Sequence, residues 1–130
     1  MVIDTSALAA IFFREPEREI FRDAILSANT RLISAVTMLE AGMVIEGRRG
    51  GGAGREFDLF AVRAFQIVAA EAEQAELARS AWRRYGKGRH PAALNFGDCF
   101  VYALAKVSGE PILAKGTDFV RTDVGVWAIT

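Results

Sequence analysis

The sequence predicts an α/β fold, a three-layer α/β/α sandwich with a central, mostly parallel sheet. Short apolar runs typical of strands alternate along the chain with longer segments whose apolar residues recur at helical spacing. Strands that are separated by helices need crossover connections, and these connections place helices over both faces of a parallel sheet. The 130 residues contain no repeat, no low-complexity tract and no linker, so we expect one domain over residues 1–130.

Local signals justify the expected elements in order along the chain. The run at residues 1–4 is apolar and ends in an acid, Pro16 suits the first turn of a helix, and Ser34 is a good N-cap. The glycine-rich segment RRGGGAG at residues 48–54 is predicted to be a mobile turn between two helices. The expected strands are residues 1–4, 31–33, 66–69, 111–114 and 126–129, and the expected helices are residues 5–13, 17–28, 35–47, 55–65, 71–85 and 98–107.

The composition excludes several kinds of site and partner. One cysteine, Cys99, and one histidine, His90, exclude a disulfide framework, a multi-cysteine zinc site and a paired-histidine metal site. The 16 Lys and Arg residues balance 16 Asp and Glu residues, and this neutrality argues against a general polyanion binder. No apolar run reaches the roughly 18–20 residues that span a bilayer, and the N-terminus lacks the basic region of a secretory signal. We therefore expect a cytoplasmic protein with no membrane partner.

Four acids occupy positions where a surface acid is not expected. Asp4 closes the first apolar run, and Asp118 follows the strand expected at residues 111–114. Glu40 falls within the apolar stripe of its helix, and Asp98 opens a helix whose next residues on the same face are apolar. Each position also has a structural explanation. Asp4 could cap the following helix, Asp98 could favour the helix dipole, Asp118 could form an Asx turn, and Glu40 could pair with an arginine.

The expected topology brings these four acids to one place. Two of them lie at the carboxyl ends of predicted strands and two near the starts of helices that cover the sheet, so all four could line one edge. Carboxylates that share a cleft repel one another unless cations neutralise them. Oxygen ligands without histidine or cysteine favour Mg²⁺ or Mn²⁺ over zinc. Such ions can activate water and stabilise the leaving oxygen in a phosphoryl displacement.

The segments that carry these acids resemble the motifs of one family. VIDTSAL at residues 2–8, SAVTMLE at 34–40, LNFGDCF at 94–100 and GTDF at 116–119 follow one another in the order typical of PIN-domain proteins. With this length, the chain looks like a VapC-type toxin of a type II toxin–antitoxin system. The resemblance covers essentially the whole chain and implies the PIN form of the three-layer sandwich.

The resemblance also implies an activity, a cofactor and partners. It implies a Mg²⁺-dependent endoribonuclease, with Mn²⁺ as an alternative ion, that cleaves RNA such as tRNA or rRNA. A VapB-like antitoxin would inhibit it, and the toxin would form a homodimer, with a heterotetramer or larger assembly when the antitoxin is bound. Asp4 and Asp98 match direct or water-bridged metal ligands, Glu40 would hold the ion or orient the attacking water, and Asp118 is the most variable of the four catalytic and metal-binding positions.

Several neighbouring residues keep more than one interpretation. Thr5 and Ser6 could hydrogen-bond a site carboxylate or cap the first helix, and Asp123 could replace Asp118 or lie exposed. A stretch without acids, residues 78–96, could guide RNA past Asp98. It contains Arg79, Trp82, Arg83, Arg84, Tyr85, Lys87, Arg89, His90 and Phe96.

Other functions remain possible on these residues. A PIN-fold module that only binds protein would not need the four acids, and a PIN nuclease of RNA processing or structured DNA would share them. A phosphatase of the DxD type is disfavoured because Ser6 stands at the second acidic position. Setting the four acids aside leaves 16 basic residues against 12 acidic ones, so the neutral total is compatible with an acidic metal site in a mildly basic protein.

Overall fold

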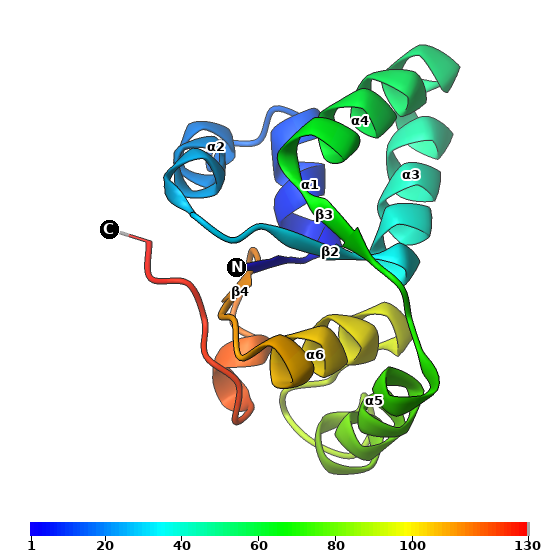
Figure 1. Cartoon of the computed structure of the whole chain (residues 1–130), viewed down its shortest axis with the longest axis vertical. Helices are drawn as coiled ribbons and strands as arrows, with labels where there is room; N and C mark the ends of the chain where they lie inside the picture. The colour runs from blue at the N-terminus through cyan, green and yellow to red at the C-terminus, as the bar shows by residue number, and fades with distance from the viewer. Residues whose placement is uncertain (130) are drawn as a thin grey trace.

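A four-stranded sheet runs through the middle of the computed structural model, which describes residues 1–129 (Figure 1). The strand order is β3-β2-β1-β4, and every pairing within it is parallel, which confirms the expected sheet. Because the strands are parallel, their carboxyl ends all meet at the same end of the sheet. The strands are β1 (Val2–Ile3), β2 (Leu32–Ser34), β3 (Gln66–Val68) and β4 (Ile112–Leu113).

Helices cover both faces of this sheet, as Figure 1 shows. Four helices lie on one face: α1 (Thr5–Phe12), α2 (Arg18–Ser27), α3 (Ala35–Arg49) and α4 (Gly51–Ala64). Two lie on the other: α5 (Ala72–Tyr85) and α6 (Phe96–Ser108). The strands alternate between these layers, since Ile3 belongs to the buried cluster on the α1 side and Val2 to the cluster on the α6 side. The three-layer sandwich is therefore confirmed.

The order of the strands creates a crevice beside β1. The chain leaves β1 through α1 and α2 toward β2 on one side, whereas β4, which follows α5 and α6, pairs with β1 on the other side. The connections on the two sides of β1 thus lie on opposite faces of the sheet. Open parallel sheets bind their ligands at such a reversal, beyond the carboxyl ends of the strands.

The glycine-rich segment at residues 48–54 is helical, so the predicted mobile turn is wrong. Helix α3 continues to Arg49, and only Gly50, with φ of 89°, separates it from α4. A Cβ atom at Gly54 would lie 2.4 Å from Oε1 of Glu46, so a glycine at this position lets α4 approach α3. Packing between the two helices therefore outweighs the low helix propensity of glycine.

The predicted strand at residues 126–129 is also wrong. Val126 alone forms a parallel bridge, to Ile112, with hydrogen bonds of 2.9 Å from Ile112 N to Gly125 O and 2.8 Å from Trp127 N to Ile112 O. Residues 127–129 form no further bridge, so this segment adds one bridge to β4 and no fifth strand. Within residues 1–129, none of the helices combines the length and apolar character that a membrane crossing needs.

Candidate active site

The four acids singled out in the sequence line one cleft. This cleft has a volume of about 360 Å³ and lies at the carboxyl end of the sheet, where β1 and β4 meet the starts of α1 and α6. Its wall includes the side chains of Asp4, Glu40, Asp98 and Asp118. The parallel topology therefore brings together residues that are 114 positions apart in the sequence at the extremes.

Asp4 is the most deeply buried of the four, with 4% of its surface exposed. It caps α1 through one oxygen, Oδ2, which accepts hydrogen bonds from Ser6 N at 3.0 Å and Ser6 Oγ at 2.5 Å. The Ser6 hydroxyl in turn accepts one from Lys115 N at 2.9 Å, which ties the end of β4 to this carboxylate. The other oxygen, Oδ1, is buried without a hydrogen-bond partner. The cap thus accounts for only half of the Asp4 carboxylate.

Glu40 is held at the boundary between protein and cleft. Thr5 Oγ1 donates a hydrogen bond to Oε1 of Glu40. A Cβ atom at Gly97 would lie 2.1 Å from Oε2 of the same carboxylate, so Glu40 occupies space that only a glycine at the start of α6 leaves open. The hydroxyl of Thr5 and the bare backbone at Gly97 therefore fix this side chain together.

The surroundings of Glu40 differ from the predicted apolar stripe. Its neighbours Leu39 and Met43 are both 66% exposed, and the buried positions of α3 lie on a different face. Among residues 1–129, Glu40 forms no ion pair with an arginine, so the salt bridge considered as its structural explanation is absent there. Its hydrogen-bond partner is Thr5 instead.

Asp98 opens α6 in a capping box with Asn95. Asn95 N donates to Oδ2 of Asp98 at 3.0 Å, and Asp98 N donates to Oδ1 of Asn95 at 2.9 Å. Both interpretations of Asp98 are therefore compatible, since this capping residue also lines the cleft. The motif Asn-x-x-Asp is recognisable in the sequence as a helix cap. No local sequence signal, in contrast, shows that Glu40 requires a glycine at position 97.

Asp118 is the outermost of the four. It follows β4 and precedes the 3₁₀ helix η1 (Phe119–Arg121), and its side chain is exposed and caps nothing. The predicted Asx-turn role is therefore not seen at this residue. Its charge nevertheless reaches the cleft, because it contributes to the raised pKa of Asp98.

Burial and mutual repulsion make the cleft unfavourable for free carboxylates. Burial, together with the negative charges of Asp4, Glu40 and Asp118, raises the pKa of Asp98 to about 7 against the opposing hydrogen bond from Asn95. Burial also raises the pKa of Asp4, with the charge of Glu40 adding to the rise and the Ser6 hydrogen bonds opposing it. Both acids are thus under-compensated in the metal-free protein.

Nearby cations do not relieve this repulsion. Lys115 lines the cleft, but its ammonium pairs with Glu15 and, at 3.4 Å, with Glu17. Across residues 1–129, no lysine, arginine or terminal amine forms an ion pair with any of the four acids. The negative charge of the cleft is therefore available to a bound cation.

The donor set fits a hard divalent cation. All four side chains offer oxygen, and Asp4 offers a buried oxygen that has no other partner. In the described part of the chain, no three His, Cys, Asp or Glu side chains are grouped so that together they could hold a metal ion. Mg²⁺ does not need such a cage, because proteins usually bind it through one or two carboxylates while it keeps several waters.

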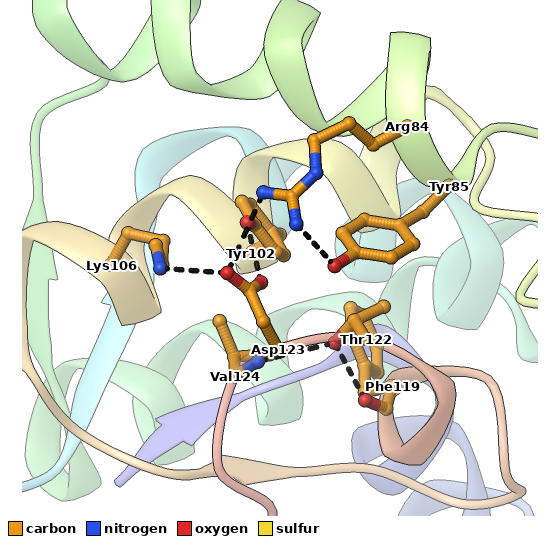
Figure 2. A network of polar contacts seen from close by, with 8 residues as sticks. All are labelled: Arg84, Tyr85, Tyr102, Lys106, Phe119, Thr122, Asp123 and Val124. Atoms are coloured by element: carbon orange, nitrogen blue, oxygen red, sulfur yellow. Dashed lines mark hydrogen bonds and ion pairs between the residues drawn. The ribbon is translucent and has the colours of Figure 1, made fainter.

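Asp123 lies outside the cleft, in the network that Figure 2 shows. It accepts hydrogen bonds from Tyr102 Oη at 2.7 Å and Lys106 Nζ at 3.0 Å, and it pairs with Arg84 at 3.5 Å. The Tyr102 hydrogen bond holds the pKa of Asp123 below its usual value. This acid anchors the C-terminal segment to α5 and α6, so it does not take the place of Asp118.

Cys99 and His90 are engaged in packing and hydrogen bonding away from the carboxylate cleft. Cys99 is 5% exposed, and burial raises the pKa of its thiol to about 11, so it is not a thiolate nucleophile at neutral pH. His90 Nδ1 accepts a hydrogen bond from Ala92 N at 3.0 Å, and its ring packs edge-on against Tyr85. Neither residue lines the carboxylate cleft.

Comparisons with known proteins agree with this architecture. The model of the PIN domain family matches residues 1–125. Ribonuclease VapC30 of Mycobacterium tuberculosis is 52% identical over 130 residues, which cover 99% of both chains. Ribonuclease VapC of Mycolicibacterium smegmatis is 55% identical over 125 residues, which cover 95% of this chain and 97% of that one.

Solved structures show the same fold at low sequence identity. The crystal structure of VapC20 from M. tuberculosis, a toxin that cleaves the sarcin–ricin loop, superposes with a TM-score of 0.78 at 18% identity and covers 95% of each chain. VapBC2 from Rickettsia felis, bound to a promoter DNA fragment, superposes with a TM-score of 0.73 at 15% identity and covers 98% of each chain. At this level of identity, these likenesses concern the fold alone.

Proposed function

This chain belongs to the PIN-domain family, and on that premise we propose that it is a metal-dependent endoribonuclease, the toxin of a type II toxin–antitoxin pair. Curated relatives that are 52% and 55% identical over nearly their full lengths carry the name ribonuclease VapC. The proposal treats residues 1–130 as one PIN domain. It also includes a cytoplasmic location, because the RNA substrate, tRNA or rRNA, is found there.

One observation carries the proposal most directly: the buried carboxylate of Asp4 keeps one oxygen without a partner in a cleft lined by three further acids. A buried charge normally has its partners satisfied within the protein. The unsatisfied oxygen and the raised pKa of Asp98 both favour a cation in this cleft. A protein-binding module with the same fold would gain nothing from this arrangement.

Each acid of the cleft has its own role in the proposed reaction. A bound divalent cation, Mg²⁺ or Mn²⁺, supplies charge to polarise a phosphodiester and lower the pKa of an attacking water. Asp4 and Asp98 would hold it, and Ser6 and Asn95 orient these two carboxylates. Glu40, fixed by Thr5, would orient the attacking water. Asp118 adds negative charge at the exposed rim.

The proposed partners follow from the same family membership. A VapB-like antitoxin would bind the toxin and block its cleft, and toxin–antitoxin complexes are among the solved structures that share this fold. The proposed assembly is a homodimer that forms a heterotetramer or a larger complex with the antitoxin. Co-expression with the protein encoded by an adjacent short reading frame, followed by purification, tests this part of the proposal.

RNA cleavage by the purified chain tests the proposed activity. Labelled RNA and DNA oligonucleotides are incubated with Mg²⁺ or Mn²⁺, and with EDTA as the metal-free control. We expect cleavage of RNA that EDTA abolishes and that falls roughly 100-fold or more in Asp4→Asn and Asp98→Asn. Asp58→Asn, which removes an exposed acid of α4, is the matched control and should cleave like the parent. Equal cleavage by all variants, or cleavage of DNA alone, contradicts the proposal.

A further inference from the structure

A second groove adjoins the carboxylate cleft. It lies between α5 and the start of α6 and has a volume of about 460 Å³. Asn95 lines both hollows and donates a hydrogen bond to Asp98, so the groove opens beside this acid. A volume of this size falls within the range of roughly 300–1,000 Å³ that is typical of small-ligand sites.

Three aromatic side chains, Trp82, Phe96 and Phe100, line the groove. Phe96, the first residue of α6, is 77% exposed. Its ring packs against that of Phe100, with the ring centres 5.4 Å apart. Trp82 is 42% exposed, and its side chain lies so close to Gly86 that a Cβ atom there would be 2.7 Å from the ring. Exposed aromatic rings contribute little to folding, so the groove offers flat apolar surface to a ligand.

The rim of the groove carries positively charged side chains that form no ion pair within residues 1–129. Arg79 and Lys87 line it, and the guanidinium of Arg89 lies 4.1 Å from the centre of the Trp82 ring. No carboxylate lines the groove, and within the described residues 1–129 none forms an ion pair with these three cations. The available positive charge therefore suits a ligand that carries phosphates.

The structure narrows the basic stretch predicted from the sequence. Arg84 is engaged with Asp123, and Tyr85 is buried with its hydroxyl beside Arg84, so neither belongs to the groove. What remains is a compact site of exposed aromatic rings and free cations next to the carboxylates. Proteins that bind single-stranded nucleic acid combine these two features, with rings for the bases and cations for the backbone.

We propose that this groove binds an unstacked base of a single-stranded RNA, with the neighbouring phosphates along Arg79, Lys87 and Arg89. This inference rests on the proposed ribonuclease function and adds a recognition site to it. The shared Asn95 wall continues the path of the RNA from the groove to the carboxylates, so a seated base places a phosphate near Asp98. The groove thereby restricts cleavage to RNA segments whose bases are free of a duplex.

Binding, measured apart from cleavage, tests the inference. Fluorescence anisotropy of a labelled single-stranded RNA of about twelve nucleotides is recorded in Mg²⁺ with Asp4→Asn as the background, because this variant should bind without cutting. Adding Phe96→Ala should raise the Kd roughly 5- to 150-fold, the range that corresponds to the loss of one base stacked on a ring. Leu26→Ala on α2, which also truncates an exposed apolar side chain (67%), is the control and should leave the Kd unchanged.

Oligonucleotides with one abasic nucleotide show whether a base is the ligand. The abasic site is moved along the RNA, and at one position it should weaken binding as Phe96→Ala does, with no further loss when the two changes are combined. Lys87→Gln should weaken all oligonucleotides alike and reduce the slope of log K against log salt by about 0.7, the value for one phosphate contact in a single strand. The thermal unfolding of each variant confirms that the fold persists.

Each contrary outcome refutes a different statement. If Phe96→Ala binds RNA as its background does, or weakens every abasic oligonucleotide as much as the intact one, the groove does not hold a base. If Phe96→Ala changes the sedimentation of the protein and not its RNA affinity, the groove is a contact between subunits. If the parent chain binds RNA through the groove but never cleaves it, the inference stands and the proposed nuclease activity fails.

Discussion

The Asp98→Asn substitution should stabilise the metal-free protein although it removes a residue of the candidate active site. Burial and three neighbouring carboxylates raise the pKa of Asp98 from the usual 3.8 to about 7. The folded protein therefore resists ionisation of this side chain, whereas the unfolded chain does not. Asparagine has nearly the same size, carries no charge and keeps an oxygen that can accept the hydrogen bond from Asn95 N.

The size of the effect follows from this pKa difference. A difference of about 3 corresponds to about 4 kcal/mol at pH 8, where the carboxyl is ionised in both states. The hydrogen bond from Asn95 is already contained in this pKa and is not counted again, whereas solvent screening of the partly exposed side chain and loss of the charge at the start of α6 together reduce the gain by roughly half. We therefore expect Asp98→Asn to raise the free energy of unfolding by about 2 kcal/mol at pH 8 in EDTA.

The pH dependence has a definite sign. Between about pH 4 and pH 7 the folded parent binds more protons than its unfolded chain, so its stability falls as the pH rises through this window. The penalty is absent below about pH 4, where Asp98 is protonated in both states. The advantage of Asp98→Asn should therefore shrink from pH 8 to pH 5.

Urea unfolding at these two pH values measures the difference. Mg²⁺ should then stabilise the parent at pH 8 and have little effect on the variant, because a ligand that binds only the folded state raises the free energy of unfolding. The matched control, Asp58→Asn, should unfold like the parent in every condition. The reasoning is refuted if Asp98→Asn is less stable than the parent at pH 8 in EDTA, or if the difference does not depend on pH.

Three further substitutions separate positioning from folding. Gly97→Ala should reduce RNA cleavage about 10- to 100-fold by displacing the Glu40 carboxylate, while the melting temperature does not fall because alanine suits a helix better; unchanged cleavage kinetics would contradict the placement of Glu40. Thr5→Val should lower kcat or metal affinity by a similar factor with a normal melting temperature, since only the hydroxyl that holds Glu40 is lost; a parent-like metal titration and kcat would argue against this role. Asp123→Asn should cleave RNA normally but lose about 1 kcal/mol of stability, a figure already reduced for the exposure of this side chain. The Tyr102 hydrogen bond lowers the pKa of Asp123 in the folded protein, so the loss is complete above the usual Asp pKa of 3.8 and vanishes as the pH falls below it. Impaired cleavage by this variant would place Asp123 in the site.

The sequence predicted the features of the fold that depend on local patterns. Alternation of apolar runs identified the parallel sheet, and Ser34 caps α3 as expected, with its hydroxyl accepting from Val36 N at 3.2 Å. The errors arose where tertiary packing decides. The glycine-rich segment is helical and lies against α3, with Gly54 beside Glu46, and the segment at residues 126–129 makes one bridge to β4 at Val126 and no strand.

The four acids of the candidate site were predictable from the sequence, whereas the contacts that hold Glu40 were not. Parallel strands bring their carboxyl ends to one edge of the sheet, so the sequence predicts that Asp4 and the segment after β4 lie close together. The hydrogen bond from Thr5 to Glu40 and the bare backbone at Gly97 depend on how α3 approaches α6. No local sequence pattern encodes that approach, and the pattern around Glu40 even indicated a buried apolar stripe where Met43 is exposed.

A calorimetric titration of the parent and Asp4→Asn with Mn²⁺ and Mg²⁺ tests the central claim most directly, because it asks whether the carboxylate cleft is a metal site. Asparagine can still cap α1, so the variant should keep its fold. We predict saturable binding by the parent, with proton release near pH 7 as Asp98 ionises, and a loss of this binding in Asp4→Asn. Absence of binding to the parent, or equal binding by both proteins, would contradict the account.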